Sequence, residues 1–232
     1  MSNEQSPAML SRRDVLLGAA AAGVAPARLP AESSSRRSSS GGRFDVERFI
    51  DDCKRASVEH GDDAQRAVQD VMGRAMSNTR EVLAGVGEPE KGGIQTLYRS
   101  PALTILNIVW SPLMQLIPHE HRMWSVIGIY TGREDNIFWQ RREGRLAAMN
   151  ATAISQGTVV PLATDVIHSV SNPIEKLTGA IHIYGGDFFA TPRSEWDPET
   201  LSERDWSIAL AIRTFKESNE RFFAQRTPSR CD

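Results

Sequence analysis

The feature that most constrains the fold is a series of short β-rich segments between Ile94 and Gly186. They are rich in β-branched and aromatic residues, and turn-forming residues bound them. Seven or eight are apparent, at 94–100, 103–110, 123–132, 136–142, 144–155, 157–163, 166–172 and 178–186. A parallel α/β sheet would need helices between its strands, and none fit here. The sequence therefore predicts a mainly β protein, a sandwich or barrel of the jelly-roll kind.

Amphipathic helical patterns flank this β region. Apolar residues recur at helical spacing in 44–58, and again in a second helix that runs from a cap at Asp62 or Asp63 to about Ala84. A last helical pattern covers about 203–225. Its start can be capped by the pair Ser202 and Asp205. We expect three parts, namely a helical segment at 44–88, a barrel at 89–192 and a C-terminal helix within 193–228 that packs on it.

The N-terminal residues indicate an export signal. Arg12 and Arg13 precede an apolar run of 11 residues, 15–25, which ends in the small residues of a cleavage site. The run is shorter than the roughly 20 residues of a bilayer span. We expect a twin-arginine signal peptide at 1–27, a flexible linker at 28–43, and a periplasmic protein without a membrane span after cleavage. The alternative is an irregular N-terminus with arginines paired by chance.

Charge and cysteine content argue against two function classes. The first 43 residues hold six arginines and three acidic residues, so the rest of the chain carries about −5 of the total charge of −2. A general nucleic-acid partner would require a basic surface. The two cysteines, Cys53 and Cys231, lie far apart, which argues against a disulfide framework and a cysteine zinc site. We expect a monomer or small homo-oligomer.

Three of the five histidines predict a metal site. His119 and His121 are one residue apart, and side chains at i and i+2 of a strand point to the same face. One metal ion can therefore be reached from both side chains. His168, 47 residues after His121, opens another β-like segment and is the candidate third ligand. The alternative is that the first two histidines lie in a polar loop without a metal.

The spacing of these histidines resembles the cupin superfamily, small jelly-roll barrels that hold a metal inside. The second half of that pattern is present as Gly157, Pro161, His168 and Asn172. The usual cupin adds a glutamate four or five residues after the second histidine, where this chain has Ser125 and Val126. The resemblance therefore implies a cupin jelly-roll barrel with flanking helices and a site of three neutral histidines.

Among three-histidine cupins, the chain resembles the thiol dioxygenases, which include cysteine dioxygenase and 3-mercaptopropionate dioxygenase. The resemblance covers roughly 90 residues, from Tyr98 to Asp187, through YRS, VWSP, PHEHRMWSVIGIYTG, DVIHSVSNP and HIYGGD. Three neutral imidazoles leave the 2+ charge of Fe(II) uncompensated, which favours an anionic ligand such as a thiolate. The resemblance implies a non-haem Fe(II) oxygenase whose partners are O2 and a small thiol, oxidised to its sulfinate.

The resemblance also implies roles for individual residues. His182 and Tyr184 match a His-x-Tyr pair on a late strand and are expected to act in catalysis. Bacterial members often have a serine two residues before that histidine, and this chain has Ala180. Cysteine dioxygenase has an arginine for the substrate carboxylate at the position of Ser100 here. Arg99 and Arg122 are then the candidate substrate-binding residues.

Other interpretations stay open from the sequence. His182 and Tyr184 can be ordinary core residues, and Arg99 and Arg122 can be solvated or ion-paired. The whole protein can be a cupin oxygenase that acts on a small molecule without a thiol. It can also be a cupin that binds a metal or ligand without catalysis.

Overall fold

The computed structural model describes residues 44–143 and 145–226, so the expected signal peptide at 1–27 and linker at 28–43 lie outside the described residues. Three helices come first and one comes last, and a short 3-10 turn at Gly61–Asp63 separates the first two. They are α1 (Val46–Glu59), α2 (Ala64–Met76), α3 (Thr79–Val86) and α4 (Ile208–Arg226). Across these two ranges, no helix combines the length and apolar character that a bilayer span requires.

Eleven strands of the described residues form two antiparallel sheets. They are β1 (Gly93–Arg99), β2 (Thr104–Trp110), β3 (Gln115–Glu120), β4 (Ser125–Thr131), β5 (Arg133–Arg142), β6 (Arg145–Ser155), β7 (Val159–Leu162), β8 (Ile167–Ser171), β9 (Thr178–Tyr184), β10 (Ser194–Trp196) and β11 (Glu203–Asp205). One sheet has the order β1-β2-β9-β4-β7, and the other has the order β11-β10-β3-β8-β5-β6.

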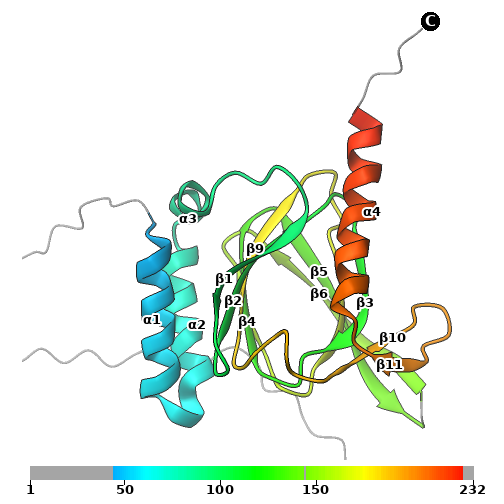
Figure 1. The fold of residues 1–232 in the computed structure, drawn as a ribbon, viewed down its shortest axis with the longest axis horizontal. Coiled ribbons are helices and arrows are strands. Elements are labelled where there is room, and N and C mark those ends of the chain that lie inside the picture. The colour runs from blue at the N-terminus through cyan, green and yellow to red at the C-terminus, as the bar shows by residue number, and fades with distance from the viewer. Residues whose placement is uncertain (1–43, 144, 227–232) are drawn as a thin grey trace, which may run out of the picture. The chain divides into compact units, whose positions relative to one another are not determined.

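The pairing of these strands is nested. β2 pairs with β9, β3 with β8, β4 with β7 and β5 with β6, as if one long hairpin had been wound into a barrel. This arrangement is the jelly roll. The predicted fold class is therefore confirmed: a mainly β jelly-roll barrel with helices flanking it on both sides (Figure 1).

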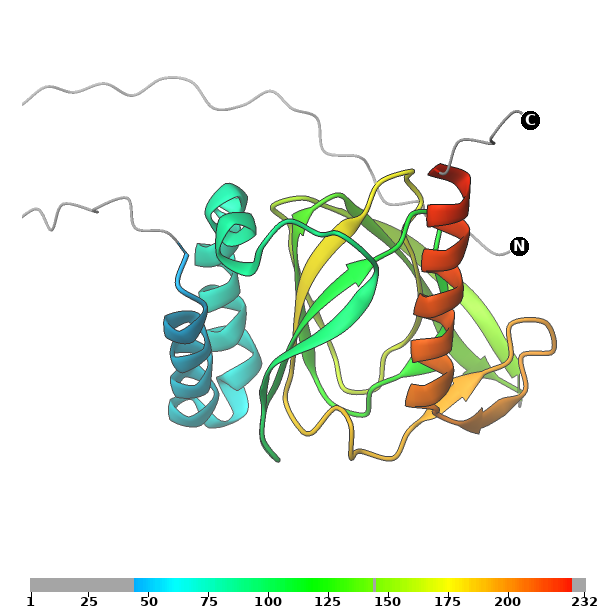
Figure 2. The same cartoon turned by 45° about the horizontal axis from the view of Figure 1, so that its top comes forward.

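Alternation along β9 explains how the barrel has two buried faces. Ile181 and Ile183 pack outward into a cluster with Phe49 of α1 and Met72 of α2, so helices cover this face of the five-stranded sheet (Figures 1 and 2). Residues 180, 182 and 184 alternate with them and point the other way, toward the six-stranded sheet. Strand alternation thus reserves one face of β9 for helix packing and the other for the barrel interior.

Helix α4 lies on the opposite side of the barrel from α1 and α2 (Figure 2). Its Phe215 stacks on Trp110 of β2 with ring centroids 5.4 Å apart, and its Ala211 joins the same buried cluster. Asn219 accepts a hydrogen bond from the backbone of Gly92 at 2.8 Å and donates to the Gly92 carbonyl at 2.9 Å. These contacts fix the last helix beside the first strand of the barrel.

Two expectations about helix boundaries are wrong. The second helix stops at Met76, and α3 begins only at Thr79, because Ser77 donates its hydroxyl to the Arg74 carbonyl and Asn78 leaves the helical region with φ −136°. The last helix starts at Ile208, so Ser202 and Asp205 do not cap it. Residues 203–205 instead form β11, which pairs with the nearby β10, and strands of three residues are too short to show a periodic pattern.

The close packing of β9 leads to a stability prediction. A Cβ atom on Gly179 would lie 2.2 Å from Cζ of Tyr130, whose hydroxyl is held by Asn107 at 2.8 Å. We expect Gly179→Ala to lower the free energy of unfolding in urea by about 2–3 kcal/mol through overpacking. The matched control is Gly73→Ala in α2, where a Cβ meets open space and should stabilise by about 0.5–1 kcal/mol. Equal effects of the two substitutions would contradict this packing.

Candidate metal centre

The three predicted metal ligands come together in the barrel interior. His119 of β3 and His168 of β8 lie directly opposite each other as paired residues of the six-stranded sheet. His121 joins them, and one ring nitrogen from each of the three lies within 4.8 Å of the others. The side chains are buried, with exposed fractions of 3%, 5% and 1% for His119, His121 and His168. The structure therefore assembles a buried three-histidine cluster that fits a single metal ion.

His121 reaches this cluster as strand alternation predicts, although it lies just past the end of its strand. Strand β3 ends at Glu120, so His121 is the first residue after it. The rings of His119 and His121 lie 4.9 Å apart, whereas Glu120 between them pairs with Arg122 and Arg141. The next residue, Arg122, has φ 54°, in the left-handed region, and the chain turns there. The alternation of β3 therefore continues through His121, and the chain turns only after it.

Hydrogen bonds to the protein orient two of the ligands. Nδ1 of His119 lies 2.9 Å from the Ile117 carbonyl, which can only accept, so Nδ1 carries the proton. Nδ1 of His168 lies 2.6 Å from Oδ1 of Asn136, which also accepts. In both rings the lone pair is then on Nε2. Nε2 of His121 lies 2.9 Å from Nε2 of His168, so the donor nitrogens converge.

Burial keeps the cluster neutral. Desolvation lowers the pKa of His119 to about 4. The hydrogen bond that Nδ1 donates to the Ile117 carbonyl opposes this shift, and the charge of Arg193 adds to it. Desolvation and neighbouring histidines lower the pKa of His121 and of His168 well below the usual value. Nδ1 of His121 is buried without a hydrogen-bond partner among the described residues. Neutral imidazoles are the form that binds Fe, Zn, Cu or Ni, so the donor set fits a divalent transition metal.

The two predicted catalytic residues lie beside this cluster. His182 and Tyr184 sit on β9, in the other sheet, and both are buried. The Tyr184 ring centroid is 4.8 Å from that of His121, and the Tyr184 hydroxyl is 3.2 Å from Nδ1 of His182. Burial raises the pKa of Tyr184, so the hydroxyl keeps its proton at neutral pH. A neutral phenol beside the cluster is able to donate a hydrogen bond there.

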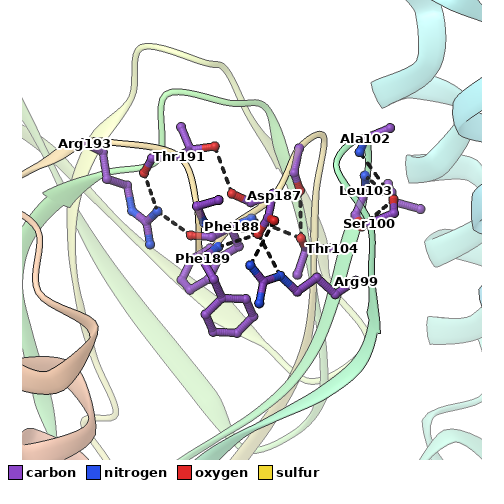
Figure 3. A network of polar contacts seen from close by, with 12 residues as sticks. Arg99, Ser100, Ala102, Leu103, Thr104, Asp187, Phe188, Phe189, Thr191 and Arg193 are labelled. Carbon is purple, nitrogen blue, oxygen red and sulfur yellow. Dashed lines mark hydrogen bonds and ion pairs between the residues drawn. The ribbon is translucent and has the colours of Figure 1, made fainter.

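The structure does not bring the two predicted substrate arginines to the cluster. Arg99 forms a two-point ion pair with Asp187, at 2.9 and 3.0 Å, and its guanidinium lies 4.9 Å from the Phe189 ring centroid (Figure 3). Arg122 is half-exposed and pairs with Glu120 at 2.5 Å. Each arginine is thus paired with a nearby carboxylate, and about half of its own side chain is exposed.

A different arginine, which the sequence did not single out, is buried near the histidines. Arg193 is 4% exposed, and its guanidinium carbon lies 4.3 Å from the Phe188 ring centroid and 4.7 Å from that of Trp206. These two rings pack in turn on the cluster, Phe188 at 5.8 Å from His121 and Trp206 at 5.2 Å from His119. The aromatic pair therefore fixes a cation beside the three histidines.

The hydrogen bonds of Arg193 are incomplete. Nη1 donates to the carbonyls of Phe188 and Thr191 (Figure 3), whereas Nε and Nη2 are buried without a partner in the part of the chain that the structure describes. Burial lowers the pKa of Arg193 to about 10, which leaves it charged at neutral pH. A buried guanidinium with two unpaired nitrogens would be stabilised by an anion that accepts hydrogen bonds from them. No sequence signal marks it, because it lies beyond Asp187 in a segment without a motif.

Comparisons with known proteins bear on the barrel alone. No protein-family model matches the chain, and no curated protein matches its sequence. A double-stranded β-helix cupin family protein from Methanocaldococcus jannaschii aligns with TM-score 0.37 and 13% identity over 44% of this chain and 86% of that chain. A double-stranded β-helix domain protein from Klebsiella pneumoniae aligns with TM-score 0.33 and 8% identity over 52% and 89%.

A third solved structure similar to the barrel is a variant of oxalate decarboxylase from Bacillus subtilis. It aligns with TM-score 0.35 and 16% identity over 44% of this chain and 27% of that chain. Another structure of the same enzyme is described as holding Mn(II) centres. These likenesses are distant, and the assignment of the fold rests on the nested strand pairing of this chain itself. The molecule is a jelly-roll barrel with a buried three-histidine site suited to a metal ion.

Proposed function

We propose that the protein is a non-haem Fe(II) enzyme of the thiol dioxygenase type, which oxidises a small anionic thiol to its sulfinate. One observation carries the proposal: a neutral three-histidine donor set lies beside a buried arginine with two unpaired guanidinium nitrogens. The donor set leaves the charge of Fe(II) available to a thiolate, and the arginine is available to a carboxylate at the other end of the same substrate.

The metal would be held by Nε2 of His119, His121 and His168. When bound, Fe(II) would supply coordination positions for the thiolate and O2 and would allow electrons to pass between them. The overall reaction is balanced without a further reductant, since the sulfur gives up four electrons and O2 accepts four. Both oxygen atoms end on sulfur, so the reaction needs no second cofactor.

The protein would contribute position and polarity. Arg193 would bind the substrate carboxylate through Nε and Nη2, which fixes the distance between that end and the sulfur. The Tyr184 hydroxyl would form a hydrogen bond with the substrate or O2 and so orient it. The rings of Phe188 and Trp206 would exclude water from this side of the substrate.

Oxygen uptake tests the proposal. We expect the iron-loaded protein to consume one O2 per sulfinate formed from 3-mercaptopropionate or cysteine, and to work at least about tenfold less efficiently on cysteamine, which has no carboxylate for Arg193. Mass spectrometry of the product distinguishes a sulfinate from a disulfide. Iron-bound protein that consumes no O2 with any thiol would contradict the proposal. Uptake with a substrate that has no thiol would favour the other oxygenase interpretation.

Export is a second part of the proposed role. The twin-arginine pathway is proposed from residues 1–27 alone, which lie outside the described residues. We expect the protein to be recovered from the periplasm, in which case its substrate is a small thiol present outside the cytoplasm. Mass spectrometry of the mature N-terminus measures this directly, and an intact residue 1 in a cytoplasmic fraction would contradict it.

A further inference from the structure

A buried carboxylate connects the metal cluster to the Tyr184 side of the barrel. Glu134 lies on β5, with an exposed fraction of 0%. Its Oε2 accepts a hydrogen bond from Nε1 of Trp110 at 2.8 Å, and its Oε1 accepts one from Nδ2 of Asn136 at 3.0 Å. Nε2 of His182 lies 3.3 Å from Oε2, within ion-pair distance. Three N–H-bearing groups thus surround one carboxylate.

The surroundings favour the ionised form of Glu134. Burial alone would raise the pKa of Glu134, but His182 nearby and the hydrogen bonds from Asn136 and Trp110 together lower it below its ordinary value. An ionised carboxylate can only accept hydrogen bonds. Every group that faces Glu134 must therefore present a proton to it.

The first consequence concerns His168. Because Asn136 presents its Nδ2 to Glu134, the other end of the amide, Oδ1, faces Nδ1 of His168 at 2.6 Å. An amide oxygen accepts, so Nδ1 of His168 carries the proton and its Nε2 keeps the lone pair that a metal needs. If the Asn136 amide were turned around, its N–H group would face Nδ1, and the proton would move to Nε2.

The second consequence concerns His182. Nε2 of His182 lies 3.3 Å from Oε2 of Glu134 and has no hydrogen-bond partner among the described residues. Because Glu134 accepts only, we expect this nitrogen to carry a proton. Nδ1 then faces the Tyr184 hydroxyl at 3.2 Å. The orientation of the His182 ring therefore places a hydrogen-bond partner, Nδ1, next to the Tyr184 hydroxyl. Ala180, two residues before His182 on the same face of β9, has no polar group that could do so.

We propose that Glu134 is a positioning residue that sets which nitrogen is protonated in both His168 and His182. The same carboxylate then fixes a metal donor through Asn136 and the hydroxyl of Tyr184 through His182. A chain of five buried side chains, His168–Asn136–Glu134–His182–Tyr184, joins the two sheets across the barrel interior. Only the effect on turnover depends on the proposed thiol oxidation, whereas the effects on histidine protonation and metal affinity do not.

The first test reads the protons directly. Nitrogen NMR of the zinc-loaded full chain, labelled with ¹⁵N-histidine, should show His168 with its proton on Nδ1 and His182 with a proton on Nε2. Zinc is used because it is diamagnetic and suits imidazole ligands. A wild-type spectrum with an unprotonated Nε2 on His182 overturns the proposal, whether or not any variant folds.

The second test replaces the carboxylate with an amide of the same shape. In Glu134→Gln one of the acceptor oxygens becomes an N–H group, which must face Asn136, Trp110 or His182. We expect zinc affinity, measured by competition with a chelator, to fall about 10- to 100-fold. Turnover per bound iron should fall at least about tenfold, with the KM for the thiol changed less than threefold, because Arg193 is untouched.

The matched control is Asp135→Asn on the same strand. This substitution also replaces a carboxylate with an amide, but the partner of Asp135 is the surface residue Arg133, at 2.6 Å. We expect its zinc affinity and turnover to stay within about twofold of wild type. A role in packing alone would lower the melting temperature of Glu134→Gln and leave its ¹⁵N spectrum and zinc affinity unchanged, and that result overturns the proposal. If wild type binds zinc but oxidises no thiol, the proposed function fails while the NMR and affinity tests still decide the role of Glu134.

Discussion

Replacing His168 with alanine is expected to lower the affinity for Fe(II) or Zn(II) by more than about 100-fold, because removing a direct ligand costs more than removing its supporting partner. Two imidazoles would remain, and no other described carboxylate or histidine belongs to the cluster. Metal content per chain after dialysis, followed by a competition titration, measures the loss. Oxygen uptake should fall in proportion to the metal that is lost.

His60→Ala is the control for that experiment. His60 lies at the C-terminal end of α1, is exposed, and contacts none of the cluster histidines. The substitution His60→Ala removes an imidazole from the same chain and changes no residue of the barrel, so metal content should stay at the wild-type level. Full metal occupancy in His168→Ala, with a circular dichroism spectrum like that of wild type, would disprove the assignment of the site.

Replacing Arg193 with alanine should have the second largest effect, on the substrate rather than on the metal. We expect the KM for a thiol carboxylate to rise about 10- to 100-fold, which corresponds to the roughly 1.5–3 kcal/mol of a hydrogen bond to a charged group. The metal content should not change, since Arg193 is not a ligand. Steady-state oxygen uptake with 3-mercaptopropionate and with cysteamine measures the effect, and cysteamine should show little of it because it has no carboxylate.

Arg99→Ala distinguishes the buried arginine from one of the two candidates, Arg99 and Arg122, that the sequence suggested. Its guanidinium is already held by Asp187, so its loss should change KM less than about twofold. A conservative Arg193→Lys should recover only part of the affinity, because lysine cannot donate two parallel N–H bonds to one carboxylate. An equal loss for cysteamine and 3-mercaptopropionate in Arg193→Ala would contradict carboxylate binding and would indicate that Arg193 only packs between Phe188 and Trp206.

Short-range patterns in the sequence predicted the barrel well. The eight β-rich segments correspond to β1, β2 and β4 to β9, because period-two alternation and turn residues are local features. Strand β3 was not among them, since its Pro118 and the polar residues after it break the apolar pattern. The two short strands after residue 193 were read as loop and helix, because three residues cannot carry a periodic signal.

The histidine cluster was predicted from local spacing. His119 and His168 are cross-strand partners, which is the kind of relation that motif spacing captures. His121 was placed by strand alternation, and its ring lies 4.9 Å from that of His119 although β3 ends one residue before it. The spacing did not reveal the turn at Arg122, which follows these two ligands.

The supporting residues could not be predicted because their partners are distant in sequence. Glu134 contacts Trp110 and His182, which lie 24 residues before it and 48 residues after it on other strands. The position of Arg193 between the rings of Phe188 and Trp206 is apparent only in the folded chain. From sequence alone, a single charged residue without a motif is expected to be exposed at the surface. Only the tertiary structure shows that these two are buried.

The place of Arg193 in the chain has a consequence for how such an enzyme can change over evolution. Arg193 immediately precedes β10, and Glu195 of β10 pairs with His119 of β3. The guanidinium is therefore supplied by the segment that follows the predicted end of the barrel at residue 192. A boundary at residue 192 would leave all three metal ligands in one piece and Arg193 in another. Under the proposed function, substitutions in the segment after residue 192 would change the substrate without removing a metal ligand.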